Sequence, residues 1–162
     1  MPEAWVINAS PIILYARIGR LDVIERLAPK IIVPSKVIEE VQDGISKDMS
    51  ARLAVDWAMR YIMPDIQVPP SVEHWDIGPG ESQVISHCLQ GNRWAVLDDR
   101  MARRCTNAHG VPIIGSLGII LRAKVCCVIE SAKPLMNKLK SAGMYVDDEL
   151  IRQSLAAIGE ES

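Results

Sequence analysis

The 162-residue sequence contains no phenylalanine, and its seven aromatic residues, four Trp and three Tyr, make up only 4% of the chain. This scarcity argues against a nucleic-acid surface built mainly from stacked aromatic rings. Eighteen Lys and Arg nearly balance twenty Asp and Glu, so the net charge is −2 and there is no overall basic character. Any binding of nucleic acid must therefore depend on a local basic patch or on a metal ion.

Zinc-binding patterns and membrane-spanning segments are also missing. The four cysteines, Cys88, Cys105, Cys126 and Cys127, form no CxxC pair and no Cys/His zinc pattern, and we interpret them as reduced, buried thiols. The N-terminus lacks a signal-peptide pattern, and the longest apolar stretch, residues 111–121, is about half the length needed to cross a bilayer. The sequence therefore predicts a cytoplasmic protein without membrane contact.

Short apolar runs alternate along the chain with amphipathic segments. The runs at 4–7, 31–33, 66–68, 94–97 and 111–114 have the length and composition of buried parallel strands. Helices are predicted over 11–16, 21–27, 35–41, 51–61, 81–89, 101–108, 117–124, 134–140 and 148–158. This alternation predicts one α/β domain over 1–162, a three-layer α/β/α sandwich with a mainly parallel sheet. Residues 130–162 are expected to form a C-terminal helical extension.

Acidic or amide side chains stand at the ends of predicted strands and at the starts of predicted helices. They are Asn8, Glu40, Glu81 and the pair Asp98 and Asp99. Asn8 follows the first strand, at the sheet edge where ligands bind in open parallel sheets. Mg²⁺ takes oxygen ligands and is usually held by one or two carboxylates with several waters. The pattern therefore indicates a site for Mg²⁺ or Mn²⁺, with Asn8 supplying a carbonyl oxygen.

Each of these residues also has a structural interpretation. Asn8 can end its strand through an Asx-turn, and Glu81 lies in a first helical turn, where the helix dipole favours an acid. Ser10 is predicted to cap the first helix, with Pro11 at its first position. One of the two aspartates, Asp98 or Asp99, is expected to cap the following helix, but two adjacent acids exceed what capping requires.

Three arginines, Arg100, Arg103 and Arg104, fall within five residues. Arg100 shares one helical face with the other two, which lie at i+3 and i+4. They form either a solvated face or a contact for the phosphate backbone, because arginine binds phosphate through paired hydrogen bonds.

Four segments together resemble the PIN-domain superfamily, and more closely a branch of small prokaryotic proteins related to VapC-type toxins. They read VINASPIILYARIGRLDVIERL, VPSKVIEEV, GPGESQVISHCLQGNRWAVLDDRMARR and GVPIIGSLGIILRAK, and in this order they cover nearly the whole chain. No single one of these segments would be enough to indicate the family. The resemblance implies a metal-dependent ribonuclease that prefers single strands and uses three or four acids.

Carried over by position, the resemblance assigns a role to each site residue. The implied catalytic residues are Asn8, Glu40, Glu81 and Asp99, and the implied metal ligands are Glu40, Glu81, Asp98 and Asp99. Substrate contacts are expected from Ser10, Arg100, Arg104 and Ser116. The family has aspartate where this chain has Asn8, so one negative charge is missing.

The function expected from these residues is cleavage of single-stranded RNA by the toxin of a toxin–antitoxin pair, with a cognate antitoxin protein as partner. The alternative is a non-catalytic module that binds nucleic acid or protein and has lost its first acid. A phosphate-accepting receiver domain is less favoured, since no accepting Asp with a companion Lys is apparent. Ile12, Ile13, Leu14 and Ile18, with residues 150–158, predict an apolar surface for a C2 homodimer.

Overall fold

In the computed structural model, residues 1–44 and 49–160 are described. Within them the chain forms five strands, β1 Ala4–Ile7, β2 Ile31–Pro34, β3 Ile62–Met63, β4 Arg93–Val96 and β5 Ile113–Ile114. The helices are α1 Ala9–Arg17, α2 Leu21–Leu27, α3 Ser35–Asp43, α4 Met49–Met59, α5 Pro70–Glu73, α6 Pro79–Cys88, α7 Arg100–Ala108, α8 Ser116–Val125, α9 Lys133–Ser141 and α10 Asp148–Ala157.

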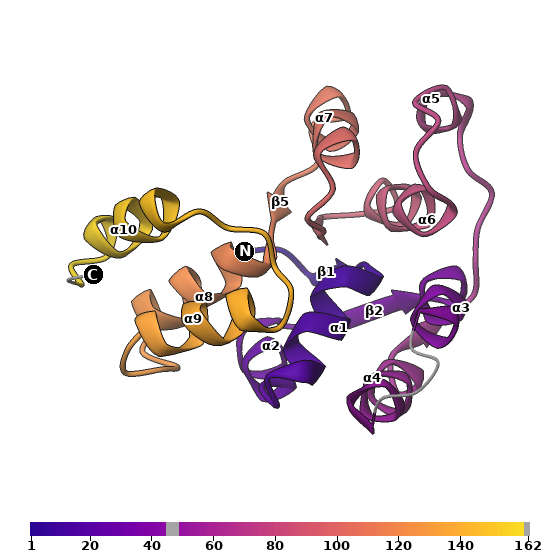
Figure 1. The fold of residues 1–162 in the computed structure, drawn as a ribbon. Helices are drawn as coiled ribbons and strands as arrows, with labels where there is room; N and C mark the ends of the chain where they lie inside the picture. The colour runs from indigo at the N-terminus through magenta and orange to yellow at the C-terminus, as the bar shows by residue number, and fades with distance from the viewer. Residues whose placement is uncertain (45–48, 161–162) are drawn as a thin grey trace.

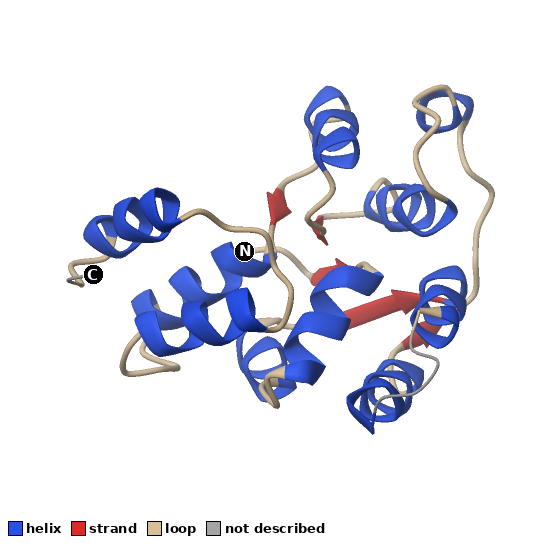
Figure 2. Ribbon diagram, viewed as in Figure 1, coloured by secondary structure: helices blue, strands red, loops and turns tan. Residues whose placement is uncertain are grey.

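The strands form one parallel sheet in the order β3-β2-β1-β4-β5. Helices α5, α6 and α7 lie on one side of it, and α1, α2, α8 and α9 lie on the other (Figures 1 and 2). The three-layer α/β/α sandwich with a parallel sheet is therefore confirmed.

The central strand β1 fixes the position of the edge at which the parallel strands end. All four of its residues are buried, as expected for a parallel strand covered on both faces. Val6 pairs with Ile32 of β2, and Ile7 pairs with Val96 of β4. The strand order reverses between β1 and β4, and ligands bind at such a reversal, beyond the carboxyl ends of the strands.

The structure differs from the sequence predictions at three places. The strand predicted at 66–68 is wrong, because β3 lies at Ile62–Met63 and pairs with β2. The backbone of Ile66 instead bonds the Gln83 side chain through both its N–H (3.0 Å) and its carbonyl (2.7 Å). The prediction of Ser10 as helix cap is also wrong, since α1 begins at Ala9 and Asn8 occupies the cap position. The short helix α5 was not predicted.

All four cysteines are free, but only Cys88 and Cys105 are buried. Burial raises the pKa of the Cys88 thiol to about 12, so it remains protonated. Cys126 and Cys127 are exposed at the end of α8, which contradicts the prediction of four buried thiols. No helix in the described parts of the chain is long and apolar enough to cross a membrane.

Residue Glu160 ties the end of the chain to the loop before α9. Its carboxylate accepts hydrogen bonds from the backbone N–H groups of Ala132 (2.7 Å) and Lys133 (3.2 Å), and it pairs with Lys124 at 3.3 Å. Burial alone raises the pKa of Glu160, but these hydrogen bonds outweigh burial and lower it.

We expect Glu160→Ala to reduce the free energy of unfolding by roughly 1 kcal/mol at neutral pH, a value discounted for partial exposure. Because the pKa of Glu160 is lowered in the folded protein, its contribution is present above the usual carboxylate pKa and disappears as pH falls through the folded pKa. Urea denaturation at neutral and acidic pH measures the effect. Glu149→Ala removes an exposed partner of Arg152 and serves as control, and equal losses in the two variants would contradict this role.

Candidate functional site

Residue Asn8 lies at the centre of the candidate site, directly after β1. Its backbone N–H donates to the Val96 carbonyl (2.9 Å), and its side chain is 3% exposed. The side chain makes no capping bond to α1, so the Asx-turn interpretation does not describe it. Instead Asn8 Nδ2 donates to Glu81 Oε1 (3.3 Å), while Asn8 Oδ1 is buried without a hydrogen-bond partner. An unpaired buried oxygen costs about 1–3 kcal/mol, so this amide is not placed for stability alone.

Two carboxylates, Glu40 of α3 and Glu81 of α6, share the space around the Gly78-Pro79-Gly80 turn. The N–H of Gly80 donates to Glu40 Oε1 at 2.9 Å. A Cβ atom at Gly80 would lie 2.3 Å from Glu40 Oε2, and one at Gly78 would lie 2.3 Å from Glu81 Oε2. Any other residue at either glycine would displace a carboxylate. The two glycines therefore make room for an acid pair.

The environment of Glu40 favours its protonated form. Burial is the main cause that raises the pKa of Glu40, and the negative charge of Glu81 raises it further, although the Gly80 hydrogen bond acts in the opposite direction. Two acids that repel each other in a partly buried place are stabilised by a cation between them.

Asp98, two residues beyond β4, forms a second cluster beside the first. Its Oδ1 accepts from the Ser116 N–H (2.8 Å), and its Oδ2 accepts from the hydroxyls of Ser116 (2.6 Å) and Ser10 (3.4 Å). Tyr15 donates its hydroxyl hydrogen to the Ser116 carbonyl (2.8 Å), and burial followed by the charge of Asp98 raises the Tyr15 pKa well above its usual value. Asp98 thus joins the ends of β4, α1 and α8.

The neighbouring acid, Asp99, has a structural position. It is exposed, and its carboxylate caps α7 by accepting from the Ala102 N–H at 2.9 Å. The structure therefore gives the expected capping role to Asp99 and leaves Asp98 facing Ser10 and Ser116.

The predicted ligands gather as two neighbouring clusters and not as one ring. Among the described residues, no three His, Cys, Asp or Glu side chains come close enough to hold one metal ion. The pair Glu40 and Glu81 nevertheless fits one hydrated Mg²⁺ or Mn²⁺, which needs only one or two carboxylates. The unpaired Asn8 Oδ1 is a further oxygen beside this pair. A site for two ions would need more acids than lie here.

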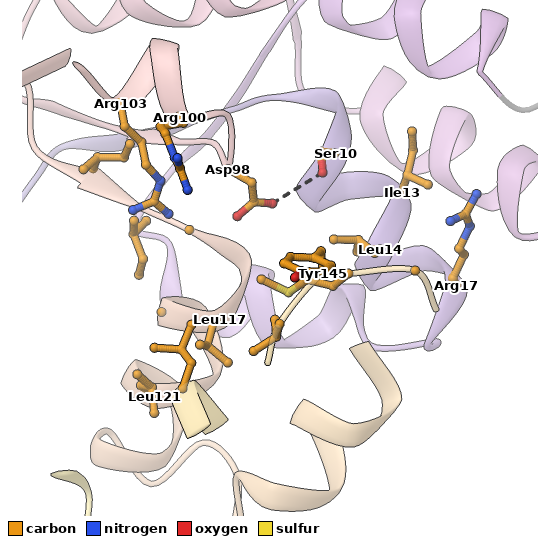
Figure 3. Close-up of a pocket in the computed structure, with 18 residues that line it drawn as sticks. Ser10, Ile13, Leu14, Arg17, Asp98, Arg100, Arg103, Leu117, Leu121 and Tyr145 are labelled. Atoms are coloured by element: carbon orange, nitrogen blue, oxygen red, sulfur yellow. Dashed lines mark hydrogen bonds between the residues drawn. The ribbon is translucent and has the colours of Figure 1, made fainter. Parts of the chain in front are cut away.

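A pocket of about 940 Å³ opens beside Asp98 and contains two of the three clustered arginines. We call it the arginine groove, and its defining residues are Ser10, Asp98, Arg100, Arg103, Leu117 and Tyr145 (Figure 3). Arg104 is exposed and does not line it, so its predicted substrate contact stays a prediction. Ser116 is fully buried, so it holds Asp98 in place and is not itself open to a substrate.

Comparison with known proteins identifies the family. The sequence model of the family DUF3368, described as a PIN domain, matches residues 4–160. The chain belongs to the PIN-domain family. This confirms the resemblance found in the sequence, and no protein of curated function matches this PIN domain significantly.

Two solved structures are similar to this PIN domain, and the first of them shares its fold. PAE2754 from Pyrobaculum aerophilum aligns with a TM-score of 0.57 at 11% identity, over 75% of this chain and 90% of that one. VapBC2 from Rickettsia felis, bound to a DNA fragment from its promoter, aligns with a TM-score of 0.46 at 14% identity, over 68% of this chain and 97% of that one. At these identities the comparison concerns the fold alone.

Glu40→Gln should raise the melting temperature of the metal-free protein at neutral pH by roughly 1–3 °C. The folded-state pKa of Glu40 is raised, so its ionised form destabilises the fold above that pKa, and the penalty disappears as pH falls below it. The gain should therefore shrink toward acidic pH in thermal denaturation experiments. Glu39→Gln, a change at the exposed neighbouring acid, is the control, and a loss of stability in Glu40→Gln at neutral pH would contradict this view of the site.

Proposed function

We propose that this PIN domain cleaves single-stranded RNA in a reaction that depends on Mg²⁺ or Mn²⁺. The observation that carries the proposal is the Glu40 and Glu81 pair, held beside Asn8 where the strand order reverses. Acidic side chains at that edge, in a chain of this family, support phosphodiester hydrolysis more than any other reaction.

Each residue has a distinct part in the proposed reaction. A bound Mg²⁺ or Mn²⁺ supplies an activated water and offsets charge on the phosphate. Glu40 and Glu81 would hold the ion, and the Asn8 amide orients Glu81 through its hydrogen bond. Asp98 is the third acid of the site, and its oxygens retain lone pairs that can accept a hydrogen bond from water. Arg100 and Arg103 attract the phosphate backbone from the arginine groove.

A non-catalytic module is the second candidate, and one observation favours it. Because Asn8 donates a hydrogen bond to Glu81, that carboxylate has a partner even without a metal ion. A site satisfied in this way can persist in a protein that binds RNA without cutting it.

A role as toxin in a toxin–antitoxin pair is proposed from the sequence resemblance. A short open reading frame directly upstream, whose product binds this protein and blocks RNA cleavage, would support it.

The proposed C2 homodimer is tested by light scattering over a range of concentrations. Ile12 and Leu14 are buried, so that interface would have to use Ile13, Ile18 and Leu150.

The adjacent aspartates offer a matched test of the catalytic proposal. Asp98→Asn should lower the cleavage rate of a labelled single-stranded RNA by about 100-fold, as should Glu81→Gln, because the site loses a charge. Asp99→Asn should stay within about threefold of wild type, since asparagine caps a helix as well as aspartate does. Addition of EDTA should abolish cleavage. Resistance to EDTA, or equal effects of the two aspartate changes, would reject the proposed site.

Asn8→Asp decides between the two candidate functions. The change places a carboxylate about where an amide now lies 3.3 Å from Glu81 Oε1, so the metal-free variant should melt at a lower temperature than wild type. It should bind Mn²⁺ roughly tenfold more tightly, and gain more stability from it, as measured by calorimetric titration and melting curves. Asn137→Asp, at an exposed position of α9, controls for added charge. Equal metal binding by wild type and Asn8→Asp would favour the non-catalytic module.

A further inference from the structure

The arginine groove combines positive charge with an apolar floor. Arg17, Arg100 and Arg103 line it, and none of them takes part in an ion pair within the part of the chain that the structure describes. Apolar side chains such as Leu14, Leu117 and Leu121 line the same groove (Figure 3). Arg17 donates a hydrogen bond to the Ala142 carbonyl (2.9 Å), and no ion pair among the described residues neutralises its charge. Guanidinium groups without acidic partners beside an apolar floor suit a ligand that has both an anionic and a flat apolar part.

An exposed aromatic ring stands in this groove. Of the seven Trp and Tyr side chains, all within the described residues, Tyr145 alone is exposed, at 97%. It lies in the loop between α9 and α10, two residues after Gly143, whose φ of +116° is accessible to few other residues. In Figure 3 the ring is drawn beside Leu14, and both residues line the groove together with Asp98. A ring left in water, in a chain so poor in aromatic residues, has a free face on which another flat ring can stack.

The groove reaches the second acidic cluster, which is built around Asp98. Ser10 and Asp98 line one end of it, and they are joined by a hydrogen bond of 3.4 Å. Gly115 makes room at that end for the Arg103 and Asp98 side chains, because a Cβ atom there would lie 2.1 Å from Arg103 Nη2 and 3.0 Å from Asp98 Oδ1. A chain bound in the groove would therefore pass directly from the arginines to the acid.

We propose that the arginine groove binds one nucleotide of a single-stranded RNA, with its phosphate on Arg100 and Arg103 and its base stacked on Tyr145. The volume of about 940 Å³ lies within the range of pockets that hold ligands of this size. This inference rests on the proposed RNA substrate, but binding tests it independently of cleavage. In this proposal Tyr145 positions the substrate, whereas the acidic residues act on the phosphate.

The test measures binding of the full chain to a fluorescein-labelled 2′-O-methyl RNA of roughly 12 nucleotides, by anisotropy in EDTA. Neither metal nor cleavage contributes under these conditions. Tyr145→Phe keeps the ring and should bind within about twofold of wild type, whereas Tyr145→Leu and Tyr145→Ala should weaken binding by roughly 5- to 100-fold. Since Tyr145 is exposed, melting temperatures should not change. Equal binding by the Phe, Leu and Ala variants would overturn the proposal.

The contribution of the groove's positive charge to RNA binding can be measured separately. Arg103→Gln should reduce the slope of log affinity against log salt concentration by about 0.7, the value for one lost phosphate contact on a single strand. Arg52→Gln removes the same charge from the exposed side of α4 and should leave the slope unchanged. An equal reduction in both variants would mean that general charge, and not the groove, attracts RNA, and would overturn the proposal.

Abasic substitution locates the stacked base. In a series of oligonucleotides, each with one abasic site at a different position, one placement of the abasic site should weaken binding to wild type. This loss should be absent in Tyr145→Ala, because the ring and the base act as a pair. If Tyr145→Ala changes the mass in light scattering and leaves RNA binding intact, the groove is an interface between protein chains and the proposal fails. Binding that depends on Tyr145 without any cleavage would refute only the catalytic function, and cleavage with binding insensitive to Tyr145 would refute only this subsite.

Discussion

The pairing of β1 with β4 is the constraint on which the rest of the site depends. Both strands are parallel, and the hydrogen bond from Asn8 to Val96 extends their ladder by one residue beyond β1. Because β1 is buried on both faces, a shift of one residue would exchange the side chains that pack against the two helix layers, so close packing on both sides holds the register. Asn8 and Asp98 consequently leave the sheet side by side, and α3 and α6 need only deliver two glutamates to that edge.

The site is also where the molecule departs from stable packing. Asn8 retains a buried oxygen without a partner, and the pKa of Glu40 is raised because a charge there is poorly hydrated. The glycines at positions 78, 80 and 115 have no Cβ atom, and charged side chains of the site occupy the space where one would lie. Such local costs, in a fold whose core is otherwise apolar, are typical of functional sites.

Sequence patterns predicted the architecture and the sheet edge, because buried strands and strand ends depend on local composition. They could not decide choices that depend on packing. Ile66 and Ile62 both lie in short apolar runs, and only pairing with β2 distinguishes them. Either of the two adjacent aspartates could have capped α7, since the choice depends on backbone direction. Arg103 and Arg104 differ by one helical step, and the position of the groove relative to α7 selects Arg103. The separation of the acids into two clusters likewise arises from tertiary structure.

The hydrogen bond from Tyr15 to Ser116 links the interior of the protein to the acid at its edge. Tyr15 has no exposed surface, yet it fixes the carbonyl of the residue whose N–H and hydroxyl both hold Asp98. The orientation of an acid at the surface is thus set from inside the core. In a mutational scan scored by the proposed RNA cleavage, position 15 would be counted with the proposed site residues, although its buried side chain cannot contact a substrate.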